Sequence, residues 1–157
     1  MKTFLTACGL MFTALTMAAD RSSSPEDAYL YFISPAHGEI VDGEVLVRFG
    51  LAGMGVAPAG VERQHTGHHH LLINMEELPP ADEPMPASDQ LIHFGAGQTE
   101  ARVKLPAGTH TLQLVLGNHH HVMHRPIVKS EKIRITVRAP KAEEPAPKKG
   151  ALGGILR

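Results

Sequence analysis

The chain has 157 residues, which is enough for one domain. Its formal net charge is -1 at pH 7, and the sequence has no basic stripe of the kind that binds nucleic acid. Its single cysteine, Cys8, lies in the apolar start of the chain, so the body offers neither a thiolate metal site nor a thiol nucleophile. All eleven histidines fall between His37 and His124, which is the strongest anomaly of the composition.

The first 19 residues, "MKTFLTACGLMFTALTMAA", have the pattern of a secretory signal peptide. A lysine precedes an apolar run, and small residues precede a cleavage point before Ala19 or Asp20. The run is shorter than the roughly 20 apolar residues that a membrane-spanning helix needs. We therefore expect a periplasmic protein that is not inserted in the membrane after signal cleavage. Residues 20–28, "DRSSSPED" and the following alanine, are expected to be a flexible lead-in.

From residue 29 onward the sequence alternates between apolar and polar residues and is broken by glycine and proline, which predicts short strands. In chain order the predicted strands are Tyr29–Ser34, Glu44–Leu51, His68–Met75, Gln90–Phe94, Thr99–Leu105, His110–Leu116 and Glu131–Arg138. Two long loops, "AGMGVAPAGVERQHTG" and "EELPPADEPMPASD", separate some of these strands, and long ordered loops are more often functional than idle.

Seven short strands without helical periodicity predict an all-β domain over residues 29–138. The expected architecture is a single antiparallel β-sandwich, immunoglobulin-like in outline. The cysteine pair and tryptophan of immunoglobulin domains are absent, so the exact topology stays open. Residues 139–157 are rich in alanine, proline, lysine and glycine and are expected to form a disordered tail.

The first histidine triplet stands in "TGHHHLLIN" at the start of a predicted strand. Alternate side chains of a strand share a face, so His68 and His70 point to one side and His69 to the other, with Leu71, Ile73 and Met75. Two imidazoles on one face of a strand can reach a single ion, because their Cα atoms are roughly 7 Å apart. His68 and His70 are therefore candidate ligands, and His69 is expected to be structural.

The second triplet, in "GNHHHVMH", follows the strand that ends at Leu116. A tight loop there can turn His121 and His124 toward one point. His93 in "LIHFG" and His110 at the start of its strand are further candidates. His37 and His65 are expected to face solvent. The complete set of predicted metal ligands is His68, His70, His93, His121 and His124.

An imidazole-rich site without thiolate suits copper first and zinc second, because copper heads the affinity order of divalent metals. The first hypothesis is a non-enzymatic metal-binding protein for storage, delivery or sensing, with another periplasmic protein as a possible partner. One alternative is a binding or scaffold module whose histidines only hold its loops. The other is a metal-dependent hydrolase that recruits Glu100 as its base.

Several of these motifs also occur together in a known family. "GMGVAPAG", "TGHHHLLIN", "HFGAGQTEARVKLPAGTHTLQLVLG" and the "H…H.P" ending, which holds His121 and His124, resemble a bacterial family catalogued as domain of unknown function 4399, over Tyr29 to Val137. The resemblance implies an exported protein of Gram-negative bacteria and supplies no activity. Its motifs contain the five candidate ligands together with His69 and His110, which are then expected to pin loops by hydrogen bonds.

Overall fold

The structure of the protein, a computed structural model, describes residues 20–139, so the predicted signal peptide and nearly all of the predicted tail lie outside it. Every regular element within this range is a strand, which confirms the all-β class. The elements are β1 (Tyr29–Ser34), β2 (Ile40–Asp42), β3 (Val45–Ala52), β4 (Gly55–Val56), β5 (Thr66–Ile73), β6 (Leu91–Phe94), β7 (Glu100–Val103), β8 (Gly108–Gly117) and β9 (Ile133–Arg138). Residues 20–139 contain no helix of the length and apolar character that crossing a membrane requires.

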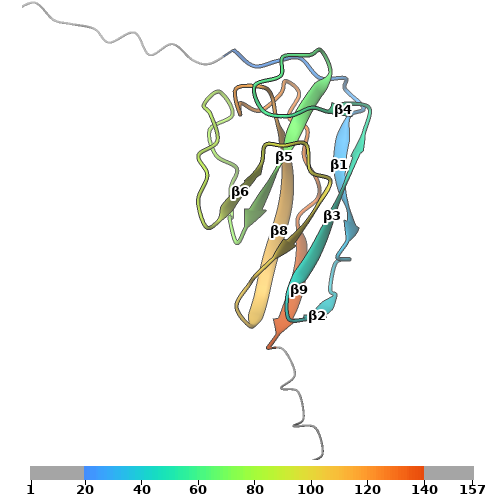
Figure 1. The fold of residues 1–157 in the computed structure, drawn as a ribbon, viewed down its shortest axis with the longest axis vertical. Helices are drawn as coiled ribbons and strands as arrows, with labels where there is room; N and C mark the ends of the chain where they lie inside the picture. Colours follow the sequence, from blue (N-terminus) through green and yellow to red (C-terminus); the bar gives the residue numbers. More distant parts are fainter. Residues whose placement is uncertain (1–19, 140–157) are drawn as a thin grey trace, which may run out of the picture.

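The strands form two sheets. One has three strands in the order β1-β3-β7, and the other has the order β2-β9-β8-β5-β4 with β6 also paired to β5 (Figure 1). Two pairings in the larger sheet are parallel, β2 with β9 and β4 with β5, so the expectation of a purely antiparallel structure is wrong. Both parallel partners are very short strands at sheet edges, which local alternation of residues does not reveal.

The main core draws buried side chains from both sheets. Phe49 of β3, Leu71 of β5, Leu114 of β8 and Ile135 of β9 all belong to it, and each is nearly or fully inaccessible to solvent. Full burial of an aliphatic or aromatic side chain contributes about 1.5–3 kcal/mol relative to exposure. The alternation that predicted these strands therefore reflects the inward face of each sheet.

A second, smaller core lies on the other face of β5 and β8. It consists of Leu72, Met85, Leu91, Val115 and Met123. The loop of residues 74–90, drawn beside β6 in Figure 1, supplies Met85 and further side chains that pack on this cluster. Strand β5 is consequently buried on both faces at every position after its first.

The start of the described chain is held against the loop that follows β8. Ser23 bridges to Arg125 in parallel, and the Ser24 amide donates to the Arg125 carbonyl at 3.0 Å. The Ser24 hydroxyl donates to the Pro126 carbonyl at 2.6 Å. The expected flexible lead-in over residues 20–28 thus contains a segment that pairs with residues about 100 positions away. This pairing fixes one side of the loop that carries His121.

Candidate metal centre

Strand β5 carries two of the predicted ligands into the interior. His68 and His70 alternate with His69 and Leu71, share the face of Leu72, and are both 0% exposed. The antiparallel register of β5 with β6 places His70 opposite His93. Sheet pairing therefore brings a third predicted ligand, His93, to the same face. His70 and His93 are far apart in the sequence, so no local pattern predicts that they meet.

A tight turn delivers His121. Asn118 is 1% exposed, and its side-chain oxygen accepts hydrogen bonds from the backbone amides of His120 (2.9 Å) and Val122 (3.0 Å). Its side-chain amide donates to the Ser22 hydroxyl at 3.1 Å, and His121 adopts a left-handed backbone with φ 66°. Asn118 thus shapes the turn that presents His121. Sequence reasoning missed this residue, although asparagine before a polar turn is a known signal.

The four imidazole rings of His68, His70, His93 and His121 meet at one place, and we call them the four-histidine cluster. The His68 ring centroid lies 4.8 Å from that of His70, 4.9 Å from that of His93 and 4.9 Å from that of His121. The His93 and His121 centroids are 4.6 Å apart. Donor nitrogens of His68, His70 and His93 all lie within 4.8 Å of one another, and in residues 20–139 they form the one group of this kind.

The buried nitrogens of this cluster have no partner in the protein. Across residues 20–139, six buried side-chain polar atoms make no hydrogen bond, and all six are histidine ring nitrogens. Five of them belong to the cluster, namely both nitrogens of His68, both of His70 and Nε2 of His93. Buried polar groups in proteins are nearly always paired, so a concentration of unpaired ones calls for an explanation. A metal ion would give one nitrogen of each ring a partner.

The rings are held in the uncharged form that metals require. Burial, reinforced by the charges of neighbouring His121 and His93, lowers the pKa of His68 from 6.5 to about 3. Burial and the charge of His68 lower the pKa of His70 to about 2. The pKa of His93 is also lowered, by burial first and then by His121. At neutral pH these imidazoles are therefore unprotonated and present lone pairs.

Two glycines make room for the rings. A Cβ atom at Gly117 would lie 2.6 Å from Cε1 of His70, and one at Gly95 would lie 2.3 Å from Cε1 of His93. Separations this short do not occur in real structures, so any larger residue would push the ring away. Gly117 in "LVLGN" and Gly95 in "HFGAG" therefore leave the space that the rings of His70 and His93 occupy.

The structure does not bring His124 into the cluster. Its Nε2 lies 3.1 Å from the Thr66 carbonyl oxygen and its Nδ1 lies 3.4 Å from the Leu116 carbonyl oxygen. A neutral imidazole carries one N–H, and the Nε2–H tautomer donates to Thr66. His124 therefore ties the loop after β8 to the start of β5. The spacing of His124 from His121 predicted a shared site. That prediction is wrong, because sequence spacing cannot show which groups surround a buried ring.

His69 and His110 hold loops, as the family resemblance implied. His69 lies on the opposite face of β5, where its ring packs against Phe49 with centroids 5.0 Å apart, and its Nδ1 donates to the Gln98 carbonyl at 3.2 Å. Nε2 of His110 donates to the Pro106 carbonyl at 2.8 Å, and its Nδ1 accepts from the Asn74 side chain at 3.0 Å.

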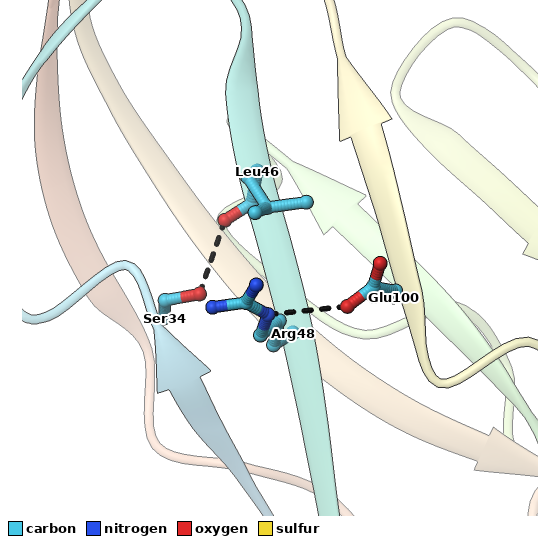
Figure 2. A network of polar contacts seen from close by, with 4 residues as sticks. All are labelled: Ser34, Leu46, Arg48 and Glu100. Atoms are coloured by element: carbon cyan, nitrogen blue, oxygen red, sulfur yellow. Dashed lines mark hydrogen bonds and ion pairs between the residues drawn. The ribbon is translucent and has the colours of Figure 1, made fainter.

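The remaining histidines and the candidate base lie elsewhere. His37, His65 and His120 are exposed, and the His120 ring packs at a tilt of 43° against that of His119, with ring centroids 4.0 Å apart. Glu100, considered as a hydrolytic base, is exposed on β7, where its carboxylate accepts from the Arg48 guanidinium of β3 at 3.1 Å (Figure 2). Its place is on the three-stranded sheet, whereas the cluster lies on the larger one.

Comparison with protein families gives a match over residues 47–138, more than half of the chain, to Domain of unknown function (DUF4399). The chain belongs to this family. The match confirms the resemblance seen in the sequence motifs, and the matched DUF4399 region contains all of the four-histidine cluster. No curated protein and no solved structure matched the chain. The family description names no activity, so the function has to be inferred from the site.

Proposed function

We propose that this DUF4399 protein binds one transition-metal ion through the four-histidine cluster, with copper as the first choice and zinc as the second. The observation that carries the proposal is the set of five buried cluster nitrogens without a partner. An isolated unpaired buried polar group destabilises a fold by about 1–3 kcal/mol. Several such groups facing one another are accounted for if an ion occupies the space between them.

The donor chemistry favours copper and zinc. Imidazole suits Cu(II), Zn(II) and Ni(II), and copper has the highest affinity among divalent metals. Metal–imidazole bonds of about 2.0–2.1 Å place tetrahedral donors about 3.4 Å apart. Small side-chain movements would bring the nitrogens of His68, His70 and His93 from within 4.8 Å to that separation. His93 and His121 are only partly buried, so an ion would enter between them.

Storage, delivery or sensing in the periplasm is the role that we propose, with another periplasmic protein as the donor or recipient of the ion. The proposed location rests on the signal-peptide pattern of residues 1–19. We favour binding over catalysis because a zinc hydrolase needs a carboxylate base near its open position, and Glu100 instead pairs with Arg48 on the surface. An immunoglobulin-like topology stays a prediction.

Calorimetric titration of the mature, untagged protein with Cu(II) and with Zn(II) tests the proposal. We expect one ion per chain, and a rise in the thermal midpoint because metal binds the folded form. The double variant His68→Ala/His70→Ala should lose both effects. The matched control His37→Ala/His120→Ala, which removes two exposed imidazoles, should keep both. Equal stoichiometry and affinity in the two double variants would refute the site and favour the scaffold alternative.

A further inference from the structure

Met85 hydrogen-bonds to one member of the four-histidine cluster, His121, and lies near another, His70. Its backbone amide donates to the carbonyl of His121 at 3.0 Å. A Cβ atom added at Gly117 would lie 3.1 Å from the methyl carbon of Met85 and 2.6 Å from Cε1 of His70. The Met85 side chain and the His70 ring therefore flank the same small space beside the Gly117 backbone. These two observations place Met85 beside the cluster, with its methyl carbon next to the space that the His70 ring lines.

The local sequence holds Met85 in this position. The residue is 4% exposed and stands in "EPMPAS", between Pro84 and Pro86. Proline fixes its own backbone and restricts the residue before it, so the segment loses little freedom when it folds against the site. Methionine is also a common filler of cores, and Met85 packs in the second core. Its hydrogen bond to His121, and its methyl carbon beside the space next to Gly117 that the His70 ring also lines, distinguish it from a filler.

We propose that the Met85 thioether is a further ligand of the site and lets it hold Cu(I) as well as Cu(II). This inference rests on the proposed function. Thioether sulfur is a soft ligand that favours Cu(I), whereas Zn(II) is satisfied by imidazoles alone. A site that combines neutral imidazoles with one thioether binds monovalent copper tightly. Removal of the sulfur should therefore weaken binding of Cu(I) and leave binding of Zn(II) nearly unchanged.

The experiment compares Met85→Leu with the matched control Met75→Leu, which changes a methionine of the same loop that packs on the same core. Leucine is close to methionine in volume, so both variants should fold. Cu(I) affinity is measured without oxygen by competition with a chromophoric Cu(I) chelator, and Zn(II) affinity by calorimetry. We expect Met85→Leu to weaken Cu(I) binding at least tenfold while Zn(II) binding changes less than threefold. Met75→Leu should match the wild type for both ions.

A second readout does not depend on affinity. With methyl-labelled methionine, addition of Ag(I), a stable substitute for Cu(I), should shift the NMR signal that is absent from Met85→Leu. An unshifted Met85 signal and equal Cu(I) affinities in wild type and variant would overturn the thioether proposal while leaving a Zn(II) or Cu(II) site intact. Failure of the wild type to bind any of these ions would overturn the proposed function and, with it, this inference.

Discussion

Replacement of His70 by leucine separates a metal ligand from a structural histidine. His70 is 0% exposed, and neither of its ring nitrogens has a hydrogen-bond partner in residues 20–139. Each unpaired buried group destabilises the fold by about 1–3 kcal/mol, and a hydrophobic replacement of similar volume introduces a misfit of less than about 1.5 kcal/mol. The two unpaired nitrogens together destabilise the fold by about 2–6 kcal/mol, so after the misfit we expect metal-free His70→Leu to be at least about 0.5 kcal/mol more stable than the metal-free wild type.

Urea denaturation at pH 7.5, with a chelator present, measures this difference in the free energy of unfolding. His110→Leu is the control, because both His110 nitrogens are hydrogen-bonded, and its loss should destabilise the protein by about 1–3 kcal/mol. With metal at a hundred times its Kd the wild type should gain about 2.7 kcal/mol, and His70→Leu should gain far less. A metal-free His70→Leu variant that is destabilised by more than about 1 kcal/mol would refute the reasoning, because the ring would then be structural.

Three further predictions concern pH, the glycines and the tail. The folded pKa values of His68 (about 3) and His70 (about 2) lie below the ordinary 6.5. The metal-free protein therefore has its full stability above about pH 6.5. As the pH is lowered below that value, the free energy of unfolding decreases by at most about 1.4 kcal/mol per pH unit for each ring. Urea denaturation at pH 7.5 and 5.5 checks this, and equal values would contradict it. Gly117→Ala should weaken Zn(II) binding at least tenfold in calorimetry by displacing His70, whereas Gly55→Ala, whose Cβ would meet its nearest atom at an ordinary 3.4 Å, should not. Deletion of residues 139–157, which lack a periodic apolar pattern, should leave the thermal midpoint unchanged in calorimetry, and a drop of many degrees would show that they pack on the domain.

Alternation in the sequence predicted most of the strands and the two faces of β5. Leu71 and Ile73 lie in the main core, and Leu72 lies in the second core on the side of His68 and His70. The predicted strand runs two residues too far, to Met75, whereas β5 ends at Ile73 and Met75 packs on the second core. Asn74 has a left-handed φ of 55°, which ends the strand and reverses the side to which the next residues point.

The site depends on contacts that no local pattern contains. His93 meets His70 through the pairing of β5 with β6, and His121 reaches the cluster because Asn118 folds the turn before it. His124 was expected beside His121, but the carbonyl of Thr66 binds its ring instead. Sequence spacing predicted the shared face of His68 and His70 on β5 and a further candidate in the loop after β8. The choice among neighbouring histidines required the register of the sheets and the surroundings of each ring.

The most direct test of the metal centre is X-ray absorption spectroscopy of the one-to-one Zn(II) and Cu(II) complexes. We expect at least three imidazole nitrogens at about 2.0 Å, identified by the outer-shell scattering of their rings. The double variant His68→Ala/His70→Ala should lose at least two of these rings from the spectrum. A shell of oxygen atoms with one imidazole or none in the wild type would contradict the four-histidine site.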